Sequence, residues 1–289
     1  MLNLISMNLY RLLKCKGAYI TIIIAILLFA LLGNILTDPE EQAMDSQIIE
    51  EQGLDIEESS GIGMTITSYY NEEAKHPQGL DIVYNDIMSS GLLLMLIGIF
   101  AAAYTNEERD SGFLKNLPMG SKQKGSIFLA KVTTIFAYSF FIILVTILAT
   151  KIGIIGRTAE VNQFYDLPGF VKYVAFQVFL HTAFATFVMF VFELCRNMLV
   201  TVICTIVVSV NVIGSVFSWV EGNIASFGTL AKRAVEYFGI VQYMIVTRVQ
   251  GLNVCYASFP HVNSLVVGII GIALYATLGA IVFSKKDVY

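Results

Sequence analysis

The stretch 106–131 reads NEERDSGFLKNLPMGSKQKGSIFLAK, and a long apolar run lies on each side of it. It holds eight charged residues, namely Glu107, Glu108, Arg109, Asp110, Lys115, Lys122, Lys124 and Lys131. Charged residues are scarce in the chain as a whole, at 14% of 289 residues, and 56% are hydrophobic. A soluble domain of this length carries about 25% charged residues. The composition therefore predicts a membrane protein with several spans, two of which this stretch connects.

Six segments are apolar and long enough to cross a membrane, for which a helix needs about 20 residues. They are 19–36, 84–105, 127–150, 169–192, 198–220 and 260–283. The sequence therefore predicts an all-α, polytopic fold with six transmembrane helices in a single transmembrane domain, 1–289. A cleaved signal peptide is not expected, because the first apolar run is too long and no small-residue cleavage site follows it.

The orientation follows from lysine and arginine, which concentrate in the cytoplasmic segments of membrane proteins. The loop 37–83 has twelve acidic residues and one basic residue, Lys75. We therefore expect 37–83 to be an acidic extracellular loop, 106–126 to be a cytoplasmic loop and both termini to lie in the cytoplasm. The acidic loop is either a solvated cap or an electrostatic attractant for a cationic substrate or a partner.

The cytoplasmic loop has the pattern of a short helix with an apolar face. Asp110 or Ser111 can cap its start, and Pro118 ends it. Its apolar residues share one face at i, i+1 and i+4 spacing, namely Phe113, Leu114 and Leu117. Such a face needs a soluble partner or the membrane surface to bury it. The plain alternative is an ordinary basic loop.

Two further segments are more apolar than simple flanks. In 1–16, a helical wheel places Leu2, Ile5, Leu9, Leu12 and Leu13 on one side and Asn3, Asn8, Tyr10, Arg11 and Lys14 on the other. This pattern predicts an amphipathic helix at the membrane interface, or else a basic flank that orients the first span. The segment 221–259 is too apolar for an outer loop, and Gly239 divides it into two helical pieces. It is either a re-entrant helical pair or a compact extracellular helix on the membrane surface.

The chain lacks motifs for chemistry of its own. The sequence 120–126 superficially resembles a phosphate-binding loop, but Ser126 follows Gly125 directly, without the required lysine. The three histidines, His76, His181 and His261, are not in a metalloprotease motif. The four cysteines have no close spacing, and we expect no disulfide. We therefore expect neither an enzyme nor a cofactor or metal site in this chain, and no nucleic acid partner.

Polar groups inside the spans are candidate residues of a translocation path: His181, Asn211 and Ser215. An asparagine in hydrocarbon needs a partner, so Asn211 either bonds a neighbouring helix or lines the path. Glu193 and Arg196, at i, i+3 in the turn between spans four and five, are expected to pair, and contact with a partner protein is a second interpretation. Gly91, Gly214, Gly268 and Gly271 allow close approach of helices.

The charged stretch resembles the inner loop of type-two ATP-binding-cassette (ABC) exporter permeases. The matching residues are Glu107-Glu108-Arg109-x-Ser111-Gly112-x-Leu114-Lys115, then Leu117-Pro118, Ser121-Lys122 and Ala130-Lys131. In that family a glutamate ends span two, a serine-glycine turn and a short coupling helix follow, and a lysine lies near the start of span three. The family often has arginine where this chain has Lys122. The family's connecting helix and re-entrant pair correspond in position to 1–16 and 221–259.

The resemblance implies a permease subunit of an ATP-driven exporter in the plasma membrane of a bacterium. Two such permease chains, identical or different, would work with two separate ATPase chains that bind ATP and magnesium. The residues expected to couple to the ATPase are Glu107, Glu108, Ser111, Gly112, Phe113, Leu114, Lys115, Leu117 and Pro118. Size and layout resemble bacterial peptide-export and peptide-immunity permeases, so the expected substrate is an amphipathic or antimicrobial peptide or a hydrophobic compound. The alternatives are a secondary transporter, a membrane enzyme, and a sensor or scaffold.

Overall fold

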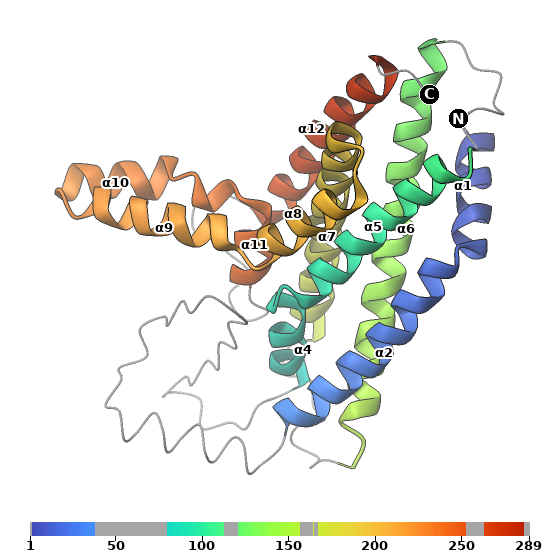
Figure 1. Ribbon diagram of the computed structural model, residues 1–289. Coiled ribbons are helices and arrows are strands. Elements are labelled where there is room, and N and C mark those ends of the chain that lie inside the picture. Colours follow the sequence, from blue (N-terminus) through green and yellow to red (C-terminus); the bar gives the residue numbers. More distant parts are fainter. Residues whose placement is uncertain are drawn as a thin grey trace.

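The computed structural model describes residues 2–37, 80–112, 121–156, 164, 167–252 and 263–285, and all regular structure among them is helical (Figure 1). The α-helices are α1 (Leu2–Lys14), α2 (Lys16–Leu36), α4 (Leu80–Ser89), α5 (Leu92–Asp110), α6 (Ser121–Gly153), α7 (Leu167–Cys195), α8 (Met198–Ser209), α9 (Val212–Ala225), α10 (Thr229–Phe238), α11 (Ile245–Gly251) and α12 (Ser264–Lys285). A 3-10 helix, η2 (Val241–Tyr243), lies between α10 and α11. The predicted all-α fold is confirmed for these residues.

The predicted membrane character is also confirmed in this part of the chain. Four helices are long and apolar enough to cross a membrane: α2, most of α6, α7 and α12. Two further pairs, α4–α5 and α8–α9, pass the same test when each is taken as one span, and each is bent by 43°. The structure therefore has four unbroken candidate spans, and six if each bent pair is a single span.

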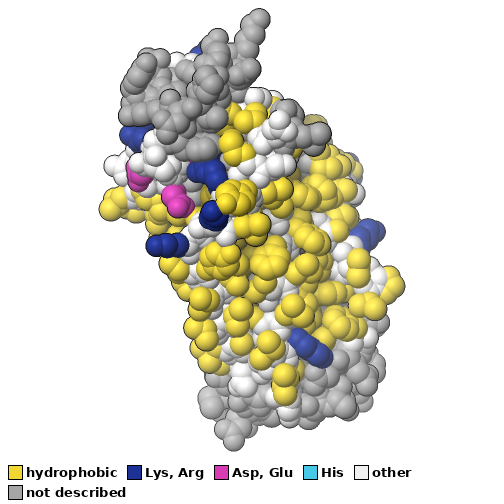
Figure 2. Space-filling model, turned by 90° about the vertical axis from the view of Figure 1, so that its right-hand side faces the viewer, with side chains coloured by type: hydrophobic (Ala, Val, Ile, Leu, Met, Phe, Trp, Pro, Cys, Tyr) yellow, Lys and Arg dark blue, Asp and Glu magenta, His cyan; other side chains and the backbone are white. Residues whose placement is uncertain are grey.

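Helix α7 is the central helix of the bundle, and α2 lies at its edge. Within the most apolar window of each helix, 67% of the α7 residues are buried and only 17% of the α2 residues. Small residues let α12 approach α7 closely, because Gly268 packs against the backbone of Phe179 and Gly271 against Ala183. The exposed side chains of α2 and α6 are largely apolar, as Figure 2 shows over the middle of one face, and this surface suits contact with lipid.

The predicted spans 84–105 and 198–220 are broken helices. The first break lies at Gly91, whose φ of 78° is left-handed, a conformation that glycine adopts without strain. The second lies at Asn211, with φ 61°, and asparagine is one of the few other residues that tolerate this region. Each segment is apolar enough over about 20 residues to be predicted as one uninterrupted span, although Asn85, Asp86, Ser89 and Ser90 stand directly before the first break.

Helices α9 and α10 form an antiparallel hairpin that projects sideways from the bundle (Figure 1). Gly239 follows the last residue of α10 as its C-cap, which is where the sequence divides 221–259. Glu221 closes the base of the hairpin by accepting hydrogen bonds from the backbone N–H groups of Ile240 and Val241. The re-entrant placement of this segment stays a prediction.

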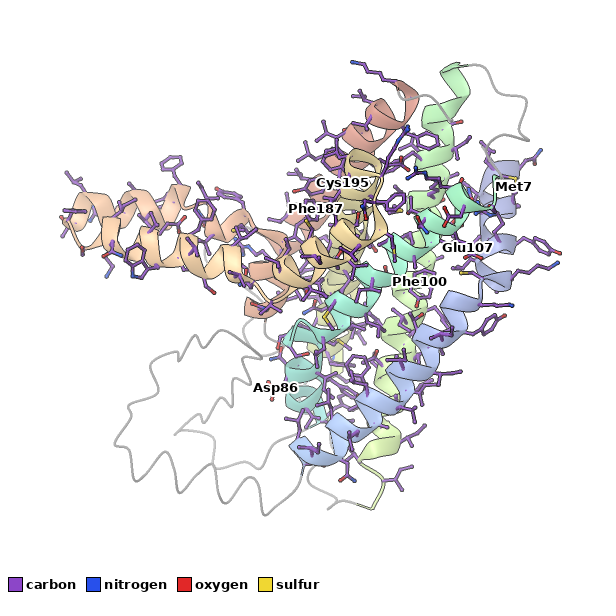
Figure 3. All side chains as sticks on the ribbon, viewed as in Figure 1. Met7, Asp86, Phe100, Glu107, Phe187 and Cys195 are labelled. Carbon is purple, nitrogen blue, oxygen red and sulfur yellow. The ribbon has the colours of Figure 1, made fainter. Side chains whose placement is uncertain are left out.

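The helix ends gather at two ends of the bundle. At one end lie α1, the last turn of α5, the start of α6, the end of α7 and the end of α12 (Figure 1). We call this the junction end, because α5 and α6 are the helices that residues 113–120 connect. Met7, Glu107 and Cys195 lie toward the junction end, and Asp86 of α4 lies toward the other (Figure 3).

Candidate functional site

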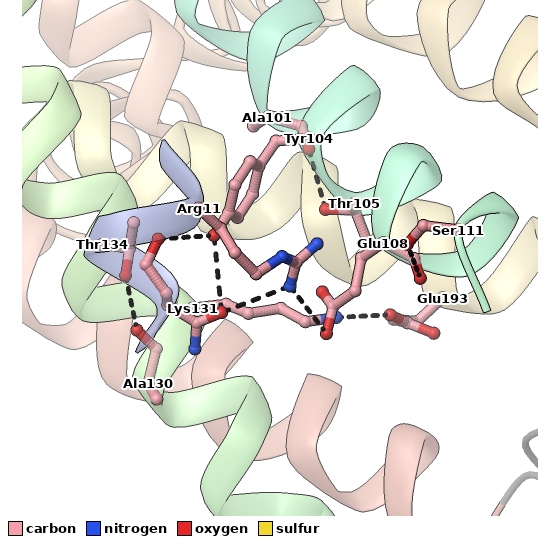
Figure 4. Close-up of polar contacts among 11 residues, drawn as sticks. Arg11, Ala101, Tyr104, Thr105, Glu108, Ser111, Ala130, Lys131, Thr134 and Glu193 are labelled. Atoms are coloured by element: carbon pink, nitrogen blue, oxygen red, sulfur yellow. Dashed lines mark hydrogen bonds and ion pairs between the residues drawn. The ribbon is translucent and has the colours of Figure 1, made fainter. Parts of the chain in front are cut away.

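Four charged side chains from four different helices meet at the junction end: Arg11 of α1, Glu108 of α5, Lys131 of α6 and Glu193 of α7 (Figure 4). Lys131 Nζ lies 2.8 Å from Glu108 Oε2 and 3.6 Å from Glu193 Oε1. Arg11 Nη1 lies 3.5 Å from Glu108 Oε1. We call these four residues the charge cluster. It joins helices that are up to 182 positions apart in sequence.

The charge cluster has a buried centre and no net formal charge, and Arg11 at its edge is 19% exposed. The side chain of Glu108 is fully buried and that of Lys131 is 1% exposed. Buried charges are tolerated only when they are paired, and removing one partner leaves an uncompensated charge. Since two carboxylates face two cations, the four helices are held in the one arrangement that brings all four groups together. Lys131 Nζ also lies 4.7 Å from the ring centroid of Phe283, which adds α12 to the contact.

Helix α1 is held against α5 by groups around Tyr104. This tyrosine lies one turn before Glu108, and its hydroxyl donates to the backbone carbonyl of Asn8 at 3.2 Å. The Arg11 guanidinium lies 5.6 Å from the Tyr104 ring centroid. Asn8 is buried. The face of α1 that the sequence marks as polar is therefore divided: Asn8 and Arg11 pack against α5, whereas Asn3, Tyr10 and Lys14 are exposed.

Glu107 makes a separate contact with the linker between α1 and α2. The thiol of Cys15 donates to Glu107 Oε2 at 3.0 Å. Burial raises the pKa of the Cys15 thiol, and the hydrogen bond to Glu107 raises it further. A thiol that stays protonated remains a donor, so this contact persists at neutral pH. The two adjacent glutamates thus fix different partners: Glu108 holds α1, α6 and α7, and Glu107 holds the start of α2.

The end of α5 is also fastened to the turn between α7 and α8. Arg109 Nη1 donates to the backbone carbonyl of Arg196 at 2.6 Å. Arg196 has a left-handed φ of 50° in that turn, and Asn197 then caps α8 by accepting from two backbone N–H groups. Ser111 donates to the carbonyl of Glu108 at 3.1 Å, and Gly112 has φ 61°. Helix α5 ends here, directly before residues 113–120.

The structure brings some of the predicted coupling residues together and does not describe others. Glu107, Glu108, Ser111 and Gly112 all lie at the end of α5. The predicted coupling-helix residues Phe113, Leu114, Lys115, Leu117 and Pro118 fall outside the described residues. Glu193 belongs to the charge cluster, where Lys131 is its ion-pair partner at 3.6 Å.

None of the three candidate path residues belongs to the charge cluster. Asn211 and Ser215 are neighbours, because the Ser215 hydroxyl donates to the Asn211 carbonyl at 3.1 Å. His181 is fully buried in α7, about 18 Å along the helix from Glu193, and its Nδ1 lies 2.8 Å from the carbonyl of Gln177. Asn211 Nδ2 donates to Gln250 at 2.8 Å, so this asparagine bonds a neighbouring helix, the first of its two interpretations. Ser215 is exposed on α9.

Sequence reasoning missed several of these contacts. Lys131 was named among the eight charges and in the family pattern but was given no partner, and Tyr104, Asn8 and Cys15 had no assigned partner. One signal was present, because Lys131 stands inside an otherwise apolar run and therefore needs a buried anion. Within the described ranges no three His, Cys, Asp or Glu side chains come together as a metal site would require.

The apolar helices and the buried charges that join them describe a multi-pass membrane protein. A model of ABC-2 family transporter proteins matches residues 59–212, more than half of the chain. The chain belongs to the ABC-2 family, and it is a permease subunit of an ABC transporter, which associates with ABC ATPase partners. The matched region includes Glu107, Glu108, Lys131 and Glu193, and it ends one residue after the break at Asn211. A comparison of the chain with curated proteins finds no match.

Proposed function

We propose that this permease serves an ATP-driven exporter, and that the charge cluster carries the motion of the ATPase from residues 113–120 into the bundle. One observation supports this most directly. Glu108 lies five residues before residue 113, and Lys131 lies ten residues after the first residue of α6; the two form an ion pair of 2.8 Å. A force on the junction therefore moves α5 and α6 together.

The other members of the charge cluster extend the moving unit. Through Arg11 the unit includes α1, and through Glu193 it includes α7. Helix α6 has 33 residues and is about 50 Å long, so it acts as a lever across the whole membrane. Coupling between distant sites requires rigid elements with two discrete arrangements. In this proposal the clustered ends of α1, α5, α6 and α7 are one such rigid element.

The remaining parts of the complex follow from the resemblance and the charge distribution. The junction end is cytoplasmic, and two ATPase chains with bound ATP and magnesium dock there, on the coupling residues of 106–126. Arg196 is an additional contact, because it lies in the turn that Arg109 holds next to the junction. Two permease chains enclose the path, in the plasma membrane of a bacterium.

The proposed substrate is an amphipathic peptide or a hydrophobic compound, moved outward. Two features support this class. The exposed side chains of α8 and α9 include large apolar residues such as Ile203, Val216 and Trp219, and the extracellular loop 37–83 is strongly acidic. An apolar face accepts the hydrophobic side of such a substrate, and the acidic loop attracts its cationic side.

Co-purification tests the proposal. We expect an ATPase with a phosphate-binding loop to purify with the tagged wild-type chain after gentle extraction from its native host. Phe113→Asp removes the apolar contact predicted at the junction, so this variant loses the ATPase. The matched control is Phe227→Asp, an equal change at the tip of the α9–α10 hairpin, where Phe227 is 85% exposed. The control retains the ATPase.

Two results would count against the proposal. If no ATPase accompanies the wild type even after crosslinking, the permease is not coupled to ATP, and a sensor or a secondary transporter becomes the better hypothesis. If Phe113→Asp and Phe227→Asp retain equal amounts of ATPase, the docking site is not the α5–α6 junction.

A further inference from the structure

The two broken spans touch each other at their breaks. A Cβ atom on Gly91, between α4 and α5, would lie only 2.7 Å from the backbone carbonyl oxygen of Ser209, the last residue of α8. The backbones are therefore in direct contact, and only glycine leaves room for it. The φ of 78° at Gly91 requires glycine independently. Two spans separated by more than 100 positions thus bend by the same 43° at one level of the bundle.

The short helix α11 connects the two breaks through one side chain. Gln250 Oε1 accepts a hydrogen bond of 2.8 Å from Asn211 Nδ2, at the break of α8–α9. Gln250 Nε2 lies 3.4 Å from the Cβ position on Gly91, at the break of α4–α5. Thr247, one turn earlier on α11, donates to Asn211 Oδ1 at 3.3 Å. Gln250 therefore bonds the second break and packs beside the first, whereas the nearby Thr247 bonds the second.

Helix α11 is itself anchored in the core of the bundle. The carbonyl of Val249 accepts from Gln177 Nε2 of α7 at 3.2 Å. The same Gln177 nitrogen donates to the Tyr173 hydroxyl at 2.9 Å, and that hydroxyl donates to the carbonyl of Asn85 in α4 at 3.4 Å. Gln177, Tyr173 and Val249 have no exposed surface. A helix held this firmly can impose a position on the two breaks beside it.

Helix breaks in a membrane protein are tolerated where neighbouring groups satisfy the freed backbone and side-chain polar atoms. They are also the places where a few residues absorb the φ and ψ changes of a moving segment. Independent packing defects have no reason to lie against each other. Here both breaks have a residue at positive φ, their backbones meet, and one glutamine lies beside both.

We propose that Gln250 is a positioning residue that couples the break at Gly91 to the break at Asn211, so that the two spans bend together during transport. On the junction side of this paired hinge lie α5 and α8, and on the other side lie α4 and α9. The proposal rests on the proposed function for its role in transport. The physical link between the breaks can be tested in the permease alone.

The first experiment is amide hydrogen exchange on the full chain in detergent, read at residues 92–95 and 212–215. Gln250→Leu removes the hydrogen bond to Asn211 and the amide group that packs beside Gly91. We expect exchange to rise in both segments, by about fivefold at 212–215, the factor that one net hydrogen bond is worth. Thr247→Val is the matched control, because it removes only the bond to Asn211. It should raise exchange at 212–215 and leave 92–95 unchanged.

A second variant guards against a general loss of structure in Gln250→Leu. Gln250→Glu keeps the acceptor for Asn211 and replaces the nitrogen that faces Gly91, so exchange should rise at 92–95 and stay low at 212–215. Exchange in α12, over 264–285, reports overall folding. The proposal is overturned if exchange at 92–95 is the same as in the wild type in both Gln250 variants.

The second experiment uses the co-purified complex and a readout that a purely structural role would not change. Adding a non-hydrolysable ATP analogue with Mg²⁺ should change exchange at both breaks in the wild type. In Gln250→Leu the ATP analogue should change hydrogen exchange at only one of the two breaks. Equal nucleotide responses in the two proteins would refute the coupling. If no ATPase purifies with the chain, the proposed function fails, whereas the exchange test on the permease alone still decides whether Gln250 links the two breaks.

Discussion

Replacing Lys131 with methionine tests the charge cluster most directly. Lys131 contacts both carboxylates, at 2.8 Å to Glu108 and 3.6 Å to Glu193. Methionine keeps most of the side-chain volume, so the loss is mainly electrostatic. Both Lys131 and Glu108 are essentially without solvent contact. Breaking a buried pair by removing one partner costs about 3–5 kcal/mol, so we expect Lys131→Met to lower the free energy of unfolding by about that amount.

A double variant separates charge from shape. In Lys131→Met alone, the charge cluster keeps two carboxylates and one cation, Arg11. In Lys131→Met with Glu193→Gln, one carboxylate and one cation remain, 3.5 Å apart, and charge balance is restored. We therefore expect the second substitution to recover more than half of the lost stability, a coupling that independent sites do not show.

The assay is reversible unfolding of the purified protein by titration with a denaturing detergent, followed by helical circular dichroism. Lys16→Met is the matched control, because Lys16 is exposed at the same end of the bundle, and surface changes of this kind stay within about 0.5 kcal/mol. The reasoning is refuted if Lys131→Met costs no more than Lys16→Met. It is refuted equally if Glu193→Gln adds to the loss instead of reducing it.

Two further predictions concern single residues. Gly91→Ala should lower the free energy of unfolding by about 1–2 kcal/mol more than Gly112→Ala. Both glycines have positive φ, but a Cβ atom at Gly91 would also lie 2.7 Å from the backbone carbonyl oxygen of Ser209. Equal shifts in thermal unfolding would contradict this close contact. At neutral pH, Cys15 should react with a maleimide at least about tenfold more slowly than the exposed Cys195, because Cys15 is buried and its raised pKa lowers the fraction of thiolate. The reaction rate of Cys15 should rise as the pH approaches that pKa. Mass spectrometry of the labelled peptides measures both rates, and equal rates at neutral pH would contradict the buried contact with Glu107.

Local composition predicted the helical spans well. The predicted span 19–36 lies within α2, and 169–192 lies within α7, because a stretch of about 20 apolar residues in hydrocarbon has few alternatives to a helix. The same composition could not reveal the breaks. Gly91 was interpreted as a close-approach glycine, which it is, but hydropathy carries no information about backbone φ. Asn211 was expected to need a polar partner, and its partner Gln250 is 39 positions away.

The sequence alone determined that the chain is an all-α membrane protein, and the pattern around Glu107 and Glu108 identified the segment that resembles an ABC permease loop. These conclusions depend on local properties, namely apolar length, charge and short spacing. The tertiary structure alone decided which charges pair and where the spans bend. Glu108 has an arginine next to it in sequence, yet its ion-pair partners are Arg11 and Lys131. The choice of partners depends on which helix faces are buried together, because a buried charge must be paired within the bundle, wherever in the chain its partner stands.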